Sequence, residues 1–132
     1  MRNWLYILDP KKEQMDGGPS TPGHVLALAQ AEPRRDWWLS RHRYMQHGDR
    51  IWIYFATPEK KVAAMGCVEG EPYGVTWDAK YPWRFPATLH ERATRALHNS
   101  PVELVELTNQ HPQGITLVKS QDLPLLLERA GL

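Results

Sequence analysis

Two apolar runs separated by a short turn constrain the fold of this 132-residue chain more than any other feature. Residues 51–56 read Ile-Trp-Ile-Tyr-Phe-Ala, residues 62–68 read Val-Ala-Ala-Met-Gly-Cys-Val, and the five residues between them include Pro58. Runs rich in β-branched and aromatic residues, joined by so short a connection, predict an antiparallel β-hairpin. Because both runs are almost continuously apolar, we expect both faces of the hairpin to be covered, or the sheet to curl. Gly66 in the second run predicts a bulge or a tight bend.

The rest of the chain carries shorter helix and strand signals, with no internal repeat and no linker, so we expect one domain over residues 1–132. A strand is expected at residues 4–8, ended by Asp9-Pro10, and another at 114–119. A helix is expected at 24–31, capped by Ser20 or Thr21 with Pro22 in its first turn. Further expectations are a second short helix or an irregular turn over 35–46, a loop over 69–82, helical turns over 101–107 with Ser100 as cap, and a closing helix after Ser120.

The stretch from Trp83 to Leu97 carries two periodicities at once. Apolar residues alternate from Phe85 to Leu89 as in a strand, whereas Leu89, Ala93 and Leu97 recur as on one face of a helix. Periodicity by itself favours a helix from residue 88 onward.

Charge and cysteine content narrow the functional classes. Sixteen Lys and Arg against fifteen Asp and Glu give a net charge of +1, which is not the broad basic field of a non-specific nucleic-acid binder. The single cysteine, Cys67, excludes an internal disulfide and a cysteine-rich zinc site, and it fits a reducing compartment. No apolar stretch approaches the ~20 residues of a membrane span. We therefore expect a cytoplasmic protein, in the simplest case a monomer, with no membrane partner.

The motifs of common enzymes are absent from the sequence. It contains no glycine-rich phosphate loop, nucleophile elbow, zinc-protease signature or calcium loop, and its six histidines are scattered. No nucleophile with a base and no acid–base pair is evident in the sequence. We expect no metal, no cofactor and no catalysis.

Six tryptophans against two phenylalanines are unusual for so small a chain. Trp4 and Trp52 lie inside apolar runs and are expected to be packing residues. The others fall in three aromatic segments, 36–40, 74–78 and 81–85, which we place in loops or at strand starts. Nucleobases are recognised by stacking on aromatic faces, so these segments are candidates for a base-binding surface. The alternative is that these tryptophans plug the ends of a small barrel.

Several segments resemble the EVE domain, a relative of the YTH domain within the PUA-like superfamily. They are Trp4-Leu5, Gly48 to Tyr54, Val62 to Val68 with its inner Gly66, Trp83-Arg84-Phe85, and Gly114 to Leu127. The resemblance implies an α+β fold, a PUA-like curled mixed or antiparallel β-barrel of five to six strands flanked by short helices. It also implies a pocket at one end for an extruded modified base, and a long strand from Trp83 to about Leu97 against the helical count.

The YTH relative builds its pocket from three tryptophans, and the matching positions here are Trp38, Trp77 and Trp83. Trp37 can exchange roles with Trp38, and an extra residue at Thr76 weakens the match at Trp77. Ser40 and Asp78 complete the expected pocket. The EVE pattern usually has an Arg and an Asn after the first tryptophan, where this chain has Arg41-His42-Arg43-Tyr44. We expect Arg35, Arg41 and Arg43 to contact phosphates, although a solvated basic face explains them equally well.

The resemblance thus implies a non-catalytic module that recognises a modified nucleobase, of the methylated cytosine or adenine class, in DNA or RNA. One alternative is a hydrolase of modified nucleosides or RNA that resembles the ASCH branch of the same superfamily. That branch has a Gly-x-Lys-Thr style element after its first strand, and Lys11-Lys12-Glu13 is the nearest approach here. The other alternative is a module that binds a protein or a small ligand.

Overall fold

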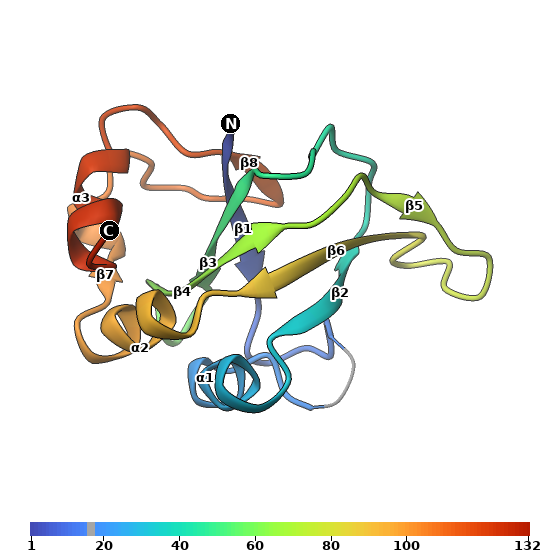
Figure 1. Cartoon of the computed structure of the whole chain (residues 1–132), viewed down its shortest axis with the longest axis horizontal. Coiled ribbons are helices and arrows are strands. Elements are labelled where there is room, and N and C mark those ends of the chain that lie inside the picture. Colours follow the sequence, from blue (N-terminus) through green and yellow to red (C-terminus); the bar gives the residue numbers. More distant parts are fainter. Residues whose placement is uncertain (16–17) are drawn as a thin grey trace.

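One curled mixed sheet with three short helices forms the computed structural model, which describes residues 1–15 and 18–132 (Figure 1). The strands are β1 (Asn3–Leu8), β2 (Arg34–Leu39), β3 (Arg50–Phe55), β4 (Lys61–Val68), β5 (Tyr73–Gly74), β6 (Trp83–Leu89), β7 (Val102–Glu103) and β8 (Ile115–Leu117). The helices are α1 (Pro22–Ala31), α2 (Glu91–Asn99) and α3 (Leu123–Arg129), with a 3-10 turn, η1 (Leu104–Glu106). No helix in the described part of the chain is both long enough and apolar enough to span a bilayer.

The sheet confirms the expected α+β class. Six strands follow the order β2-β6-β4-β3-β1-β8, and the two-residue strands β5 and β7 add to β6 and β4. The β1–β3 pair is parallel and the other described pairs are antiparallel. The sheet curls so that the Tyr6 hydroxyl of β1 donates a 2.7 Å hydrogen bond to the Trp38 carbonyl of β2, although these strands do not pair. One side-chain bond thus spans the open side of a half-barrel.

The predicted hairpin is present as β3 and β4, joined by residues 56–60. Its register shifts between Ile53 and Tyr54, which leaves Ala63 of β4 as the extra residue. The irregularity therefore lies three residues before Gly66, and not at the glycine. Gly66 serves a close approach instead, because a Cβ there would lie 2.9 Å from the backbone oxygen of Thr88 on β6. A side chain at this position would push apart two strands of the barrel wall.

Both faces of β3 and β4 are covered, as the continuous apolar runs predict. One core cluster lies inside the curl and includes Trp4, Ile53 and Phe85, and the other lies between the sheet and helices α2 and α3 and includes Trp52. Trp4 is 5% exposed and Trp52 is fully buried, so both are packing residues as expected. The Trp52 indole donates to Asn3 Oδ1 at 3.0 Å, which satisfies the polar edge of a ring that is otherwise costly to bury.

Asp49 ties the N-terminus to the turn before β3. Its carboxylate accepts hydrogen bonds from the Trp4 indole and from the backbone amides of Arg2 and Gln46, at 3.0–3.1 Å. Burial by itself would raise the pKa of Asp49. The three hydrogen bonds outweigh burial, so the pKa lies below its ordinary value. The structure therefore stabilises the ionised carboxylate.

The expectation of a helix or irregular turn over 35–46 is wrong for its first half, because residues 34–39 form β2. Burial alternates along this strand, with Trp37 and Leu39 buried and Arg34 and Asp36 exposed. This two-residue period is typical of a strand with one covered face. Of the two basic residues of β2, Arg34 lies on the solvent side, whereas Arg35 lies on the covered side with its side chain 14% exposed. Two adjacent arginines on opposite faces hide the alternation in the sequence.

The long strand that the resemblance implies from Trp83 to about Leu97 is also wrong. Strand β6 ends at Leu89 and helix α2 follows at once, as the helical count predicts. The His90 side chain caps the helix by accepting from the backbone amide of Ala93 at 3.0 Å. Thr94 exchanges hydrogen bonds with the Met65 backbone, and Leu97 is fully buried beneath the sheet. The apolar stripe thus packs as one helical face.

Two capping predictions near the C-terminus are wrong. Ser100 lies at the C-terminal end of α2, and the following residues form β7 and η1, where Glu103 occupies the N-cap position. Asp122 precedes α3 in place of Ser120, and its carboxylate accepts from the amide and hydroxyl of Thr108. The strand expected over 114–119 is present as the shorter β8.

Candidate functional site

The β2–β6 ladder sorts the candidate tryptophans onto two faces of the sheet. Its register pairs Trp37 with Phe85, Trp38 with Arg84, and Leu39 with Trp83. Directly opposed residues of an antiparallel pair share a face, and neighbours along a strand alternate. Trp38 and Arg84 therefore lie on one face, and Trp37 and Trp83 lie on the other.

Trp37 is a core residue and does not belong to a pocket, contrary to its place in the expected site. It is 1% exposed, and its ring meets Tyr6 edge-on at 5.7 Å inside the curl. Trp38 is half-buried, which settles which of the two neighbouring tryptophans faces outward.

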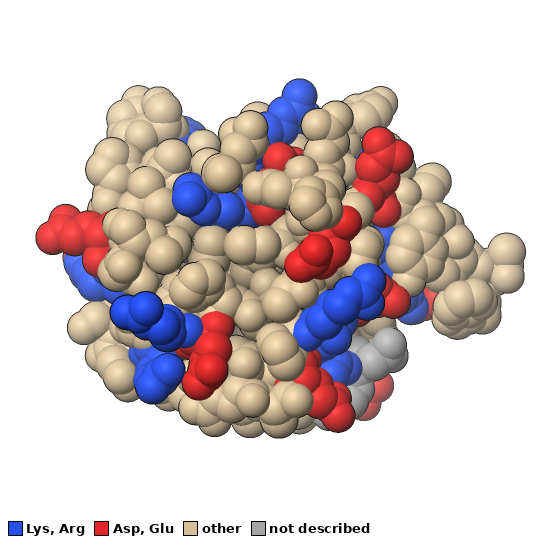
Figure 2. Space-filling view, viewed as in Figure 1, with Lys and Arg blue, Asp and Glu red and all other residues tan. Residues whose placement is uncertain are grey.

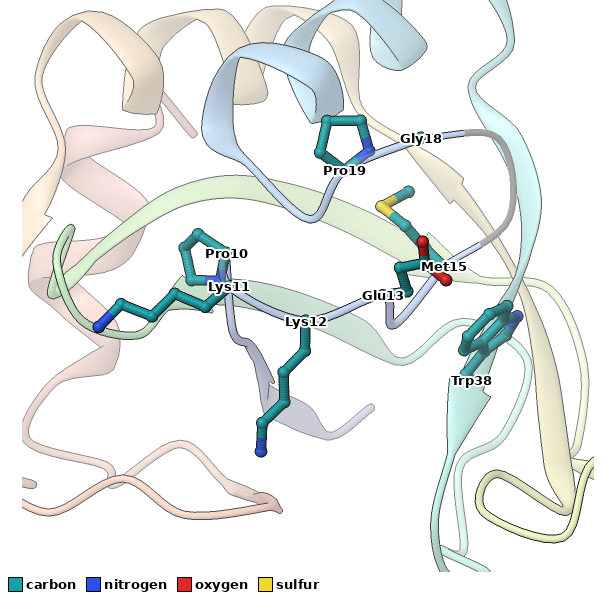
Figure 3. Close-up of a pocket in the computed structure, with 8 residues that line it drawn as sticks. All are labelled: Pro10, Lys11, Lys12, Glu13, Met15, Gly18, Pro19 and Trp38. Carbon is teal, nitrogen blue, oxygen red and sulfur yellow. The ribbon is translucent and has the colours of Figure 1, made fainter.

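Trp38 borders a pocket of about 600 Å³ (Figure 3). The opposite walls come from the segment between β1 and α1. The described lining residues are Pro10, Lys11, Lys12, Glu13, Met15, Gly18, Pro19 and Trp38. In Figure 3, the side chains of Lys11 and Lys12 point away from Trp38, whereas the Glu13 carboxylate lies on the side of the loop nearer the indole. The pocket thus joins an aromatic wall, a carboxylate and a cationic outer rim.

Neighbouring side chains fix the Trp38 indole in place. The Arg84 guanidinium lies over the ring at 4.8 Å, and the Tyr81 ring packs beside it at 5.4 Å. The Gln14 amide donates to the Tyr81 hydroxyl at 3.3 Å and so links the pocket loop to the residue that supports Trp38. Burial raises the pKa of Tyr6, so its hydroxyl stays protonated and continues to donate to the Trp38 carbonyl.

Asp78 shapes the loop formed by residues 75–82, between β5 and β6. One carboxylate oxygen accepts from the backbone amides of Tyr81 and Lys80, and the other accepts from Arg84 at 3.0 Å. The pKa of Asp78 lies below its ordinary value, chiefly because the carboxylate accepts from the Tyr81 amide and also because it binds Arg84. Asp78 is therefore ionised at neutral pH. Both carboxylate oxygens of Asp78, which we expected to contact a base, therefore already accept hydrogen bonds within the protein.

The three expected cage tryptophans do not line one pocket. Trp77 is 77% exposed on the 75–82 loop. Trp83 packs against the inner core and meets His42 at 4.8 Å, on the face of the ladder opposite Trp38. The structure brings Trp38 together with Tyr81 and Arg84 instead, because strand alternation separates Trp83 from it.

The three arginines that we expected to contact phosphates are not equally free to do so. Arg35 forms an ion pair with Glu32 at 3.2 Å. Arg43 donates to the carbonyls of Ile115 and His42, which anchors the segment between β2 and β3. Arg41 is exposed, as is Ser40, directly after β2. Of the three, Arg41 retains the greatest freedom to meet a phosphate.

Several residues at the pocket were not among the predicted site residues. Glu13 and Met15 line it, and Tyr81 and Arg84 support its aromatic wall. Lys11 and Lys12 were considered only for a hydrolase. The charged Lys-Lys-Glu run directly after the first strand was the available signal, because loops that leave a sheet edge carry many binding residues. Among the described residues, no group of His, Cys, Asp or Glu is arranged to hold a metal ion.

The comparisons with known proteins show the fold of the chain but not a family to which it belongs. No protein-family model matches the chain, and no curated protein matches it in sequence. Among solved structures, Rpa0253 from Rhodopseudomonas palustris superposes with a TM-score of 0.64 at 16% identity, over 99% of this chain and 94% of that one. Atu2648 from Agrobacterium tumefaciens gives 0.63 at 14% identity, over 100% and 94%.

An ASCH protein from Zymomonas mobilis has a TM-score of 0.58 at 14% identity, over 96% of this chain and 94% of that one. The fold is therefore of the PUA-like kind, with an ASCH protein among its structural neighbours. The EVE branch specifically stays a prediction.

Proposed function

We propose that this chain is a nucleic-acid-binding module that holds one unpaired or extruded base against Trp38. The observation that carries the proposal is the half-buried indole of Trp38 at the wall of a pocket of about 600 Å³. That volume lies within the usual range of small-ligand pockets, roughly 300–1,000 Å³. An indole held by Arg84 and Tyr81 is already oriented for stacking, so little order needs to be gained on binding.

The pocket has the chemistry that a base and its backbone require. Stacking on an aromatic side chain contributes roughly 1–3 kcal/mol, which offsets the few kcal/mol needed to unstack a base. The Glu13 carboxylate can accept from the exocyclic amino group of cytosine or adenine, and Met15 offers an apolar contact for a methyl group. Lys11 and Lys12, on the outer rim, are placed for flanking phosphates. A methylated cytosine or adenine fits this combination.

The charge distribution favours recognition by a pocket over a basic surface. The net charge is +1, and Figure 2 shows cationic and anionic side chains interspersed over one face of the molecule. Such a surface gives little sequence-independent attraction for a phosphate backbone. Affinity should therefore depend on the base that is held, more than on the length of the strand.

Titration with mononucleotides of methylated and unmethylated cytosine and adenine tests the proposal. Stacking on Trp38 should quench intrinsic fluorescence. Trp38→Ala should weaken binding by about 1–3 kcal/mol while the circular dichroism spectrum keeps its shape. Tyr44→Ala is the matched control, because Tyr44 is 74% exposed and does not line the pocket. Equal binding by wild type and Trp38→Ala, or no binding of any nucleotide, would contradict the proposal.

A hydrolase is the second candidate, because Lys11, Lys12 and Glu13 line the same pocket after the first strand. A lysine beside a carboxylate can supply general acid–base catalysis. The Lys12 ammonium also lies 3.9 Å from the Asp9 carboxylate. As a binding module the protein should give no turnover of modified nucleosides or RNA. Hydrolysis that disappears in Lys11→Gln or Lys12→Gln would favour the enzyme.

A further inference from the structure

The 75–82 loop exposes a large aromatic side chain, that of Trp77, to solvent. All six tryptophans lie within the described residues, and Trp77 is the exposed one, at 77%. Figure 1 shows the β5–β6 hairpin extending away from the body of the fold. A ring on an unconstrained loop could turn inward, whereas hydrogen bonds constrain the backbone of this loop.

Hydrogen bonds at the base of the loop hold Trp77 in its exposed position. The Val75 amide donates to the Pro82 carbonyl at 2.8 Å and closes the neck of the hairpin. Asp78, the residue after Trp77, accepts from two backbone amides of the loop and from Arg84. Val75 itself is buried, so the chain on one side of Trp77 is anchored in the fold. The indole therefore offers its face to a partner without a large loss of loop entropy.

The loop is continuous with the Trp38 wall. Tyr81 and Arg84, which pack on the Trp38 indole, are the same residues that bind Asp78. Lys80 is exposed on the loop, and its ammonium lies 5.6 Å from the centre of the Tyr81 ring. Trp77 and Lys80 thus lie on the loop whose Tyr81 packs on the Trp38 indole. An exposed aromatic ring with a cation nearby is the pattern of single-strand binding surfaces.

We propose that Trp77 stacks on the nucleotide next to the base held at Trp38, so that the 75–82 loop forms a second subsite for single-stranded nucleic acid. This inference rests on the proposed function of the Trp38 pocket. The loop would replace the stacking partner that a neighbouring base loses when the first base enters the pocket. The ligand is then at least a dinucleotide.

The test compares 5-methylcytidine monophosphate and 6-methyladenosine monophosphate with short single-stranded RNA and DNA oligonucleotides that carry the same base at the centre. Trp77→Ala should bind the mononucleotides like wild type, because it does not line the pocket. It should bind the oligonucleotides about 5- to 150-fold more weakly, the range expected for one stacked base. Trp38→Ala should weaken both classes of ligand. Trp77→Tyr should restore most of the oligonucleotide affinity.

Two further measurements separate stacking from other causes. The slope of log K against log salt should not change in Trp77→Ala, because stacking releases no counterions. Val105→Ala is the control for removal of an exposed apolar side chain. Val105 is 83% exposed in η1, beside β7, which Figure 1 places at the other end of the molecule from β5. This control and Trp77→Ala should both keep the thermal midpoint of wild type.

The outcomes distinguish this inference from the proposal beneath it. Failure of wild type to bind any nucleotide overturns both. An oligonucleotide affinity unchanged in Trp77→Ala but lowered in Trp38→Ala overturns the second subsite alone. Equal losses of mononucleotide and oligonucleotide binding in Trp77→Ala would place Trp77 in the first pocket. That result would also overturn the second subsite. Self-association that Trp77→Ala abolishes, with oligonucleotide binding unchanged, would assign the loop to a second copy of the chain.

Discussion

Tyr6→Phe removes the hydroxyl that joins β1 to β2 and leaves the ring. The phenyl group keeps its edge contacts with Trp37 and Phe85, at 5.7 and 5.5 Å, so the packing of the core is retained. The Trp38 carbonyl loses its 2.7 Å donor at a site where the tyrosine is 2% exposed. Leaving a buried acceptor without a partner costs about 1–3 kcal/mol. For a domain of this size that corresponds to a fall in Tm of about 3–12 °C.

Urea unfolding measures this loss, and the m-value should be unchanged because the same surface is exposed on unfolding. Tyr54→Phe is the matched control. Tyr54 is 4% exposed, and the structure records no hydrogen bond of its hydroxyl with any described residue. Tyr54→Phe should change the free energy of unfolding by no more than about 0.5 kcal/mol. Nucleotide affinity should also fall in Tyr6→Phe, by less than in Trp38→Ala, because the backbone of Trp38 becomes less constrained.

The pH dependence gives a second readout of the same hydroxyl. Burial raises the pKa of Tyr6 above its unfolded value of about 10. Its contribution to stability is therefore complete below that pH and is lost as the pH rises above it. Tyr6→Phe should flatten the alkaline decline more than Tyr54→Phe does, although burial also raises the pKa of Tyr54. Equal losses of stability in the two variants would refute the reasoning that the hydroxyl closes the half-barrel.

Three other variants test the fold. Gly66→Ala should destabilise by about 1–3 kcal/mol in urea unfolding, because its Cβ would lie 2.9 Å from the Thr88 oxygen, and a neutral result would contradict the close approach. Trp52→Ala should cost about 3–5 kcal/mol in the same assay, since the side chain is fully buried, and it should lose binding only through unfolding. The low pKa of Asp49 gives stability that is complete above its unfolded value of about 3.9 and is lost as the pH falls through the folded value. Asp49→Asn should therefore be less stable at neutral pH, and its stability should fall less as the pH is lowered. The same decline of stability at acid pH as in wild type would contradict the role given to Asp49.

The sequence by itself determined the elements whose signal is local. The β3–β4 hairpin follows from two apolar runs and a short turn, and the burial of Trp4 and Trp52 follows from their places in such runs. Helix α2 was also present in the sequence, as the recurrence of Leu89, Ala93 and Leu97. The family resemblance, which favoured a strand there, was less reliable than the local periodicity.

The candidate site required the tertiary structure, because its contacts join residues far apart in the chain. Neighbouring tryptophans at positions 37 and 38 look alike in the sequence, and the pairing of β2 with β6 decides which of them faces outward. The same pairing puts Trp83 on the face away from Trp38. The bond between Tyr6 and Trp38 spans 32 residues, and that between Gln14 and Tyr81 spans 67. Composition and local periodicity indicate that aromatic residues are available for binding, but only register and sheet curvature determine which of them share a surface.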